Sequence, residues 1–147
     1  MKCVRAIILG LIIAMTGALP SMAATYECTI NKRSMNNTWI APKITFIYDE
    51  ASGTVRIDDA NIREVWDIPV PGKVLIDNNK KIRFSWLVRG MKNNKNPTVP
   101  DRDIQRGFVY SASYWKATGK LTVTLFDNTH GRIMGRITGE GTCDVKP

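Results

Sequence analysis

The chain contains one histidine and three cysteines, and no long apolar run follows its N-terminal segment. A catalytic triad needs a base that a third group orients toward a nucleophile, and His130 lies in an expected turn without such a motif. One histidine and one cysteine pair also fall short of the ligand set of a usual zinc site. The inventory therefore gives no catalytic residue, no metal ligand and no cofactor, and it favours a protein that is not an enzyme.

The N-terminal segment has the pattern of a secretory signal peptide. Lys2 and Arg5 precede an uncharged apolar stretch, and Ser21 and Ala23 place small residues where a signal peptidase reads. The alternative is a retained membrane anchor, but the stretch is shorter than the roughly 20 residues that span a bilayer. We expect residues 1–23 to be removed, which would leave a periplasmic or extracellular chain without a transmembrane segment.

Cleavage would leave one cysteine pair. Cys3 is lost with the signal, so Cys28 and Cys143 remain, and a single pair in an exported chain predicts one disulfide. Such a bond requires Cα atoms within about 7 Å of each other. The first and last strands must then be neighbours or face each other. The alternative is two buried free thiols.

Apolar and polar residues alternate with the period of a β-strand through most of the remaining chain. Ile82, Phe84 and Trp86, for example, are separated by Arg83 and Ser85. Strands with one polar face are typical of antiparallel sheets, and turns rich in Asn, Asp and Gly join them. The expected strands cover residues 26–30, 43–48, 54–58, 73–77, 81–89, 107–115, 120–127 and 132–138.

About eight strands in up-and-down order predict an all-β fold, a small antiparallel β-barrel over residues 24–147 closed by the disulfide. A β-sandwich is the alternative. Two segments interrupt the strands. Asp58 or Asp59 is expected to cap a short helix, which Pro69 and Pro71 prevent from continuing. The second segment, residues 90–106, is a long connection without clear periodicity.

Aromatic residues on the inward faces of two expected strands are candidates for lining a ligand site. In a small barrel, inward side chains either fill the core or surround one small ligand. Filling the core is the usual outcome, and a small apolar ligand is the functional alternative. The four residues are Phe84, Trp86, Tyr110 and Tyr114.

Basic residues outnumber acidic ones, which gives a formal net charge of +8. A basic contact loop follows the fifth expected strand, where Asp101 and Asp103 only partly offset the cations. A polyanionic surface such as lipopolysaccharide or anionic lipid is a possible partner, against the alternative of a merely solvated surface. Nucleic acid is disfavoured because no base-stacking motif accompanies the charge. The cations of this loop are Arg89, Lys92, Lys95, Arg102 and Arg106.

Two short motifs resemble a known family. Tyr26-Glu27-Cys28, with Cys143 near the end, is similar to the frame of the small β-barrel periplasmic lysozyme inhibitors, and Ser52-Gly53 resembles the start of their inhibitory loop. That family has a tyrosine where this chain has Arg56, so no functional residue is carried over. The resemblance implies an inhibitor of a secreted hydrolase, although the positive net charge would repel basic lysozymes.

Together these features predict an exported, non-catalytic binding module. Its ligand is either a small apolar molecule inside the barrel or an anionic surface outside it. A protein-interaction or inhibitor role toward a secreted or periplasmic hydrolase is the alternative, and an enzyme without a recognisable motif comes third. A pocket lined by the four aromatic residues would favour a small ligand, whereas a filled barrel with an exposed apolar or charged loop near residues 90–106 would favour a protein partner.

Overall fold

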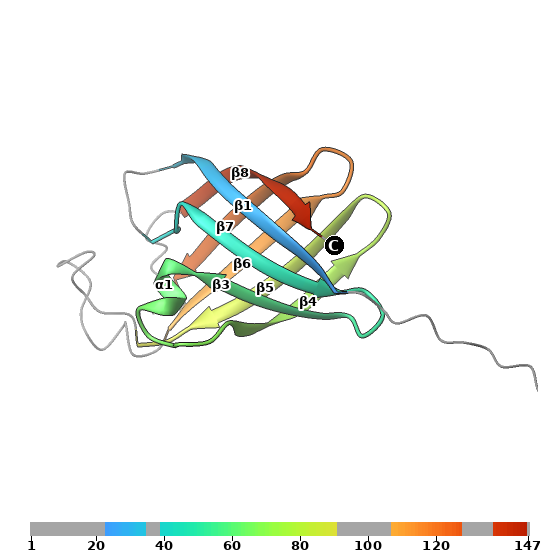
Figure 1. Cartoon of the computed structure of the whole chain (residues 1–147). Coiled ribbons are helices and arrows are strands. Elements are labelled where there is room, and N and C mark those ends of the chain that lie inside the picture. The colour runs from blue at the N-terminus through green and yellow to red at the C-terminus, as the bar shows by residue number, and fades with distance from the viewer. Residues whose placement is uncertain (1–22, 35–38, 91–106, 128–136, 147) are drawn as a thin grey trace, which may run out of the picture.

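Eight antiparallel strands close into a barrel in the order in which they occur along the chain, as the computed structural model shows (Figure 1). The structure describes residues 23–34, 39–90, 107–127 and 137–146. This architecture confirms the predicted all-β barrel and not the sandwich. The strands are β1 (Ala24–Arg33), β2 (Lys43–Asp49), β3 (Thr54–Asp59), β4 (Val70–Asp77), β5 (Lys81–Val88), β6 (Phe108–Trp115), β7 (Lys120–Asp127) and β8 (Ile137–Lys146).

The barrel closes where β1 pairs with β8, and the disulfide joins these two strands. Cys28 and Cys143 are direct cross-strand partners with their Cα atoms 3.9 Å apart. The bond confirms the predicted pairing of the first and last strands. Because β1 also pairs with β2, no strand of the barrel is left with an open edge.

The last strand lies further along the chain than the sequence predicts. The expected strand covers residues 132–138, whereas β8 begins at Ile137, and residues 132–136 lie outside the described part of the chain. Gly139 and Gly141 weaken the strand pattern because glycine lacks a side chain to pack. A Cβ atom on Gly141 would lie 2.0 Å from the carbonyl oxygen of Thr29, so the glycine permits the close approach of β8 to β1.

The two ends of the barrel differ. Short turns between β2 and β3, β4 and β5, and β6 and β7 form one end, which we call the hairpin end (Figure 1). The other end, the loop end, carries the short helix α1 (Ala60–Arg63). The Asp59 side chain caps α1 by accepting a 2.8 Å hydrogen bond from the backbone N–H of Ile62, which confirms the predicted helix start.

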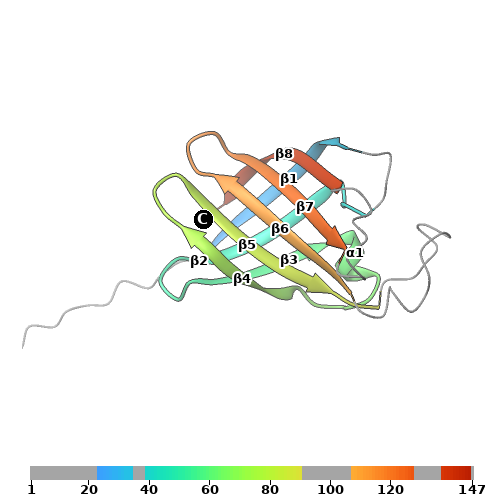
Figure 2. The same ribbon diagram turned by 180° about the vertical axis from the view of Figure 1, so that it is seen from behind.

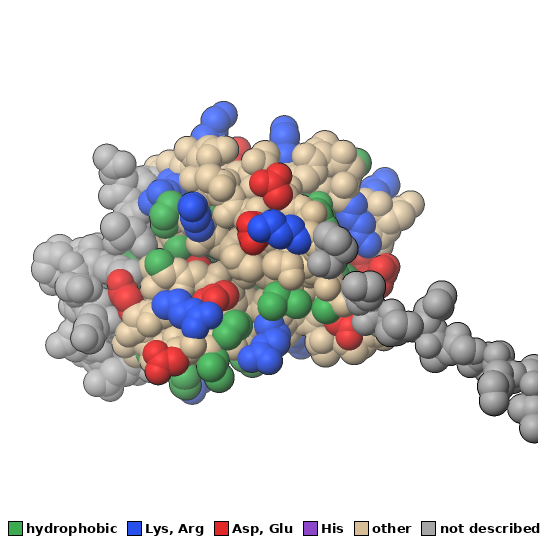
Figure 3. Space-filling view, in the orientation of Figure 1, with side chains coloured by type: hydrophobic (Ala, Val, Ile, Leu, Met, Phe, Trp, Pro, Cys, Tyr) green, Lys and Arg blue, Asp and Glu red, His purple; other side chains and the backbone are tan. Residues whose placement is uncertain are grey.

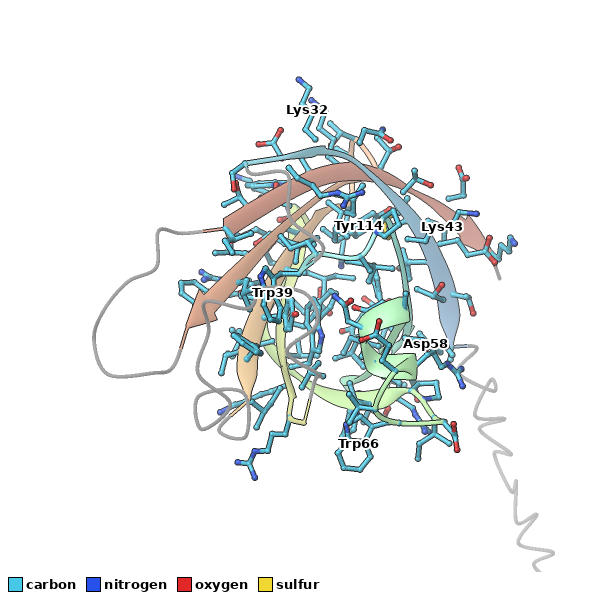
Figure 4. All side chains as sticks on the ribbon, turned by 90° about the vertical axis from the view of Figure 1, so that its left-hand side faces the viewer. Lys32, Trp39, Lys43, Asp58, Trp66 and Tyr114 are labelled. Atoms are coloured by element: carbon cyan, nitrogen blue, oxygen red, sulfur yellow. A yellow bond between two sulfur atoms is a disulfide. The ribbon has the colours of Figure 1, made fainter. Side chains whose placement is uncertain are left out.

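A buried segment before β2 fills the loop end. Trp39, Ile40 and Ala41 all belong to the core. The Trp39 carbonyl accepts hydrogen bonds from Asn61 Nδ2 at 2.6 Å and from the Tyr110 hydroxyl at 2.9 Å. Seen from this end, Trp39 lies within the ring of strands (Figure 4). Within the described residues, no helix is long and apolar enough to cross a membrane.

Candidate functional site

The four aromatic residues expected to line a ligand site point inward and are buried. Trp86 stacks on Tyr110 with ring centroids 5.1 Å apart, and the centroid of Phe84 lies 5.8 Å from that of Trp86. Tyr114 packs against Tyr26 and Phe46, and the ring centroid of Phe46 lies 4.8 Å from that of Phe84. The structure thus brings the four predicted residues into one aromatic cluster, Tyr114 through Phe46. Their role toward a ligand stays a prediction.

Neighbouring side chains occupy the interior space beside two inward-facing glycines. A Cβ atom on Gly72 would lie 2.5 Å from Ile57 Cδ1, and one on Gly139 would lie 3.0 Å from Ile30 Cγ2. Trp86 Nε1 is the one buried side-chain nitrogen or oxygen without a hydrogen-bond partner among the described residues. Core side chains therefore occupy the space beside these two glycines.

The basic contact loop lies largely outside the described residues. Of its five cations only Arg89 is described, and it is exposed. A Cβ atom on Gly107 would lie 2.6 Å from Arg89 Cγ and 2.9 Å from Leu87 Cδ1. The Arg89 side chain therefore lies beside Leu87 where β5 ends and β6 is about to begin. The other four cations lie outside the described residues: Lys92, Lys95, Arg102 and Arg106. His130 also lies outside them, in a different segment.

The strands β5, β6 and β7 lie side by side on one face of the barrel (Figure 2). We call the surface made by their outward residues the β5–β7 wall. Cross-strand pairing arranges its side chains in four rows. Each row therefore contains one residue from each of the three strands. From the hairpin end to the loop end, the rows are Lys81–Trp115–Lys120, Arg83–Ser113–Thr122, Ser85–Ser111–Thr124 and Leu87–Val109–Phe126.

Positive charge dominates the β5–β7 wall. The sole acidic residue of the three strands is Asp127, the last residue of β7. Lys73 extends the wall onto β4, where it pairs with Ser85. The positive character ends at β8, where Glu140 is the cross-strand partner of Thr122. The strand cations of the wall are Lys73, Lys81, Arg83 and Lys120, and Arg89 follows β5.

The opposite side of the barrel carries both signs of charge. Lys146 on β8 forms a 2.6 Å ion pair with Glu27 on β1. Arg63 of α1 forms an ion pair with Asp58 at the end of β3. On that side, each of these two cations is therefore neutralised by a carboxylate in a direct ion pair. The β5–β7 wall has no such internal compensation among its described strand residues.

Small hydroxyl side chains lie between the larger side chains of the wall and close to the backbone of the sheet. Ser111 and Thr124 are buried although they alternate with inward residues. Arg83 Nε donates a weak 3.4 Å hydrogen bond to Ser111 Oγ, so the side chain of this arginine extends from β5 over β6. At the hairpin end, Lys81 Nζ lies 5.0 Å from the centroid of the exposed Trp115 ring. Cations, hydroxyl groups and an aromatic ring are thus presented together, an arrangement suited to an anionic ligand.

An apolar groove adjoins the wall at the loop end. It has a volume of about 440 Å³ and lies between the segment that precedes β4 and the end of β5. Trp66 is 47% exposed and points away from the barrel (Figure 4), and Ile68 is 61% exposed. Hydrophobic side chains also show along the lower edge of the barrel in Figure 3, near this segment. The groove is lined by Trp66, Ile68, Pro69, Val70, Pro71, Leu87 and Arg89.

A polar cluster fixes the hairpin end. Asp77 accepts hydrogen bonds from Lys116 Nζ at 2.8 Å and from the Tyr48 hydroxyl at 2.5 Å. The bond from Lys116, followed by that from Tyr48, lowers the pKa of Asp77. Burial and the bond to Asp77 raise the pKa of Tyr48, and the bond to Asp77 raises that of Lys116. This cluster ties together β2, β4 and the turn after β6.

Sequence reasoning placed the positive contact surface in the loop at residues 89–106 and did not group the cations of β4, β5 and β7 into one face. The signal that could have revealed the wall is the absence of Asp and Glu from the outward-facing positions of three successive strands. The chain matches no protein-family model, no curated protein and no solved structure at a significant level.

Proposed function

We propose that the protein is an exported, non-catalytic binding module that docks an anionic surface on its β5–β7 wall. The observation that carries this proposal is the run of cations at outward strand positions without an acidic residue among them. Export is supported by the Cys28–Cys143 disulfide, since such bonds persist in oxidising compartments. The signal-peptide pattern of residues 1–23 supports it independently.

The spacing of the cations suits an extended ligand rather than a single small anion. Alternate residues of a strand lie about 7 Å apart, and neighbouring strands about 4.8 Å apart. Lys81 and Lys120 are separated by one strand, and Arg83 belongs to the next row. All three therefore lie within about one to two Debye lengths of each other at physiological ionic strength. Their potentials add, and a polyanion gains contacts that a monovalent ion does not.

The close packing of the interior supports a ligand that binds outside. Side chains occupy the space beside Gly72 and Gly139, and the ring of Trp86 stacks on Tyr110. A small apolar ligand would have to displace these contacts. An anionic surface meets the β5–β7 wall without any rearrangement of the core.

Retention on immobilised heparin tests the proposal. In Arg83→Glu/Lys120→Glu, two cations of the wall are reversed, and each cation near an anionic surface contributes about 1 kcal/mol. We expect affinity to fall at least about 30-fold, and elution to move to lower salt. Lys43→Glu/Lys146→Glu makes the same change in net charge on the opposite side and is the matched control.

The control should retain most of the wild-type affinity, apart from a small loss through net charge. Equal losses in the two double variants would mean that net charge alone drives binding, which contradicts a specific surface. Elution of the wild-type protein below physiological salt would remove the proposal altogether. Circular dichroism of each variant checks that the barrel is intact.

A further inference from the structure

The β5–β7 wall ends at the loop end in a strip of apolar side chains that are exposed or half-buried. Leu87, Val109 and Phe126 are cross-strand partners and form its last row. Leu87 also lines the groove that contains Trp66 and Ile68. The row and the groove are therefore continuous, and we call them together the apolar rim. Contiguous apolar surface of this kind on a small protein marks a site of interaction.

The strand cations lie above the apolar rim at increasing distance from it. Lys73 belongs to the adjoining Ser85 row, and Arg89, two residues past Leu87, lines the groove of the rim itself. Arg83 is four residues from Leu87 along β5, which corresponds to about 14 Å. All described strand cations of the wall lie on the same side of the rim. The surface is thus layered, with apolar side chains at one end and positive charge behind them.

This layering matches the profile of a lipid bilayer. The interfacial region on each side of the hydrocarbon core is about 5–8 Å thick. If the rim reached the acyl boundary, Lys73 in the adjoining row would lie at the level of the headgroups. Arg83, in the next row, would remain within about a Debye length of the lipid charge. Trp66 would take the interfacial position that tryptophan side chains prefer.

We propose that the anionic surface is an anionic lipid bilayer, into whose interface the apolar rim inserts with the β5–β7 wall facing the headgroups. The inference rests on the proposed function for the role of the wall, and adds the partner and the orientation. A protein partner would need acidic residues placed opposite each cation. A bilayer needs only an apolar layer beneath a charged one, and the rim and wall provide that order.

Two tryptophans at opposite ends of the wall test the orientation. Trp66 is 47% exposed at the rim, and Trp115 is 40% exposed in the row at the hairpin end. Trp115 lies six residues from Val109 along β6, about 20 Å away. Trp39 and Trp86 are buried and form a constant background. Insertion therefore brings Trp66 to the acyl chains and leaves Trp115 outside them.

The experiment measures fluorescence quenching by brominated lipid in vesicles of phosphatidylglycerol and phosphatidylcholine, with the disulfide-bonded full chain. Trp115→Phe, which keeps Trp66, should be quenched strongly on binding. Trp66→Phe, which keeps Trp115, should show only the background change. Equal quenching of the two variants, or stronger quenching of the second, would overturn the proposed orientation.

Vesicle sedimentation with a matched pair of variants tests the apolar contribution. Leu87 and Ile47 are outward strand residues with nearly equal exposure, 38% and 37%, but Ile47 lies on β2 away from the rim. Leu87→Ser should weaken binding to anionic vesicles by about tenfold. Ile47→Ser should leave it unchanged. Equal effects of the two substitutions would contradict insertion through the rim.

Heparin and neutral vesicles separate failure of this inference from failure of the proposed function. Heparin retention that depends on Arg83 and Lys120, without binding to anionic vesicles, would overturn the bilayer and leave the polyanion surface standing. Absence of both activities would overturn both. Equal binding to pure phosphatidylcholine would contradict the role of the cations. Light scattering tests whether the protein instead forms dimers without lipid. Dimers that are lost in Leu87→Ser would mean that the rim binds a second copy of this chain, and that result would overturn the bilayer.

Discussion

Reduction of the Cys28–Cys143 bond should remove a large part of the stability of the barrel. The two cysteines are 115 residues apart in the sequence, and the chain-entropy relation for a loop of this length gives about 5 kcal/mol at 25 °C. The β1–β8 hydrogen bonds remain after reduction, so the barrel keeps its closure but loses the constraint on its unfolded state. With a urea m-value of about 2 kcal/mol/M, the unfolding midpoint should fall by about 2 to 2.5 M.

Equilibrium unfolding in urea, followed by tryptophan fluorescence with and without a phosphine reductant, measures this shift. Reduction of the wild-type protein leaves both sulfur atoms in place, so it isolates the cross-link from core packing. Cys28→Ala/Cys143→Ala is the control, and reductant should not change its midpoint. A wild-type midpoint that moves by less than about 0.5 M, corresponding to about 1 kcal/mol, would refute the entropic reasoning.

Three further predictions concern the core and the polar cluster. Tyr110→Phe removes one of the two hydrogen bonds to the Trp39 carbonyl and should cost about 1 kcal/mol in urea unfolding; an unchanged midpoint would contradict that bond. Gly72→Ala places a methyl group against Ile57 and should cost about 1–3 kcal/mol in the same assay, whereas a stabilised variant would indicate empty space there. Because the pKa of Asp77 is lowered in the folded state, its contribution to stability is fully present above the usual aspartate pKa of 3.8 and is lost as pH falls through the folded pKa. Asp77→Asn should therefore flatten the acid limb of stability against pH, and an unchanged limb would exclude this carboxylate as its source.

The fold was accessible from the sequence wherever one strand face is apolar and the other polar. Ile82, Phe84 and Trp86 are buried, and the residues between them face outward, as their alternation predicts. The position of Cys143 opposite Cys28 follows from the need to close the barrel. The final strand was predicted to end at Thr138, whereas β8 continues to Lys146. Gly139 and Gly141 serve close backbone and side-chain packing, and this need has no hydrophobic signature.

The candidate surface was less accessible for a geometric reason. The basic loop concentrates its cations in one stretch of sequence, whereas those of the wall are distributed over separate strands. Only the cross-strand register brings Lys81, Trp115 and Lys120 into one row. The apolar rim likewise combines Trp66, from the segment after α1, with Leu87 at the end of β5. Neither grouping can be read from local periodicity.

The most direct test of the central claim is a titration of isotope-labelled protein with a heparin oligosaccharide, followed by backbone amide chemical shifts. The largest shift changes should map to β5, β6 and β7, with Ser85, Ser111 and Ser113 among the residues affected, and should disappear in high salt. The amides of β2 and β3 serve as the internal reference and should not move. Changes confined to β2 and β3 would contradict an anionic-ligand surface on the β5–β7 wall.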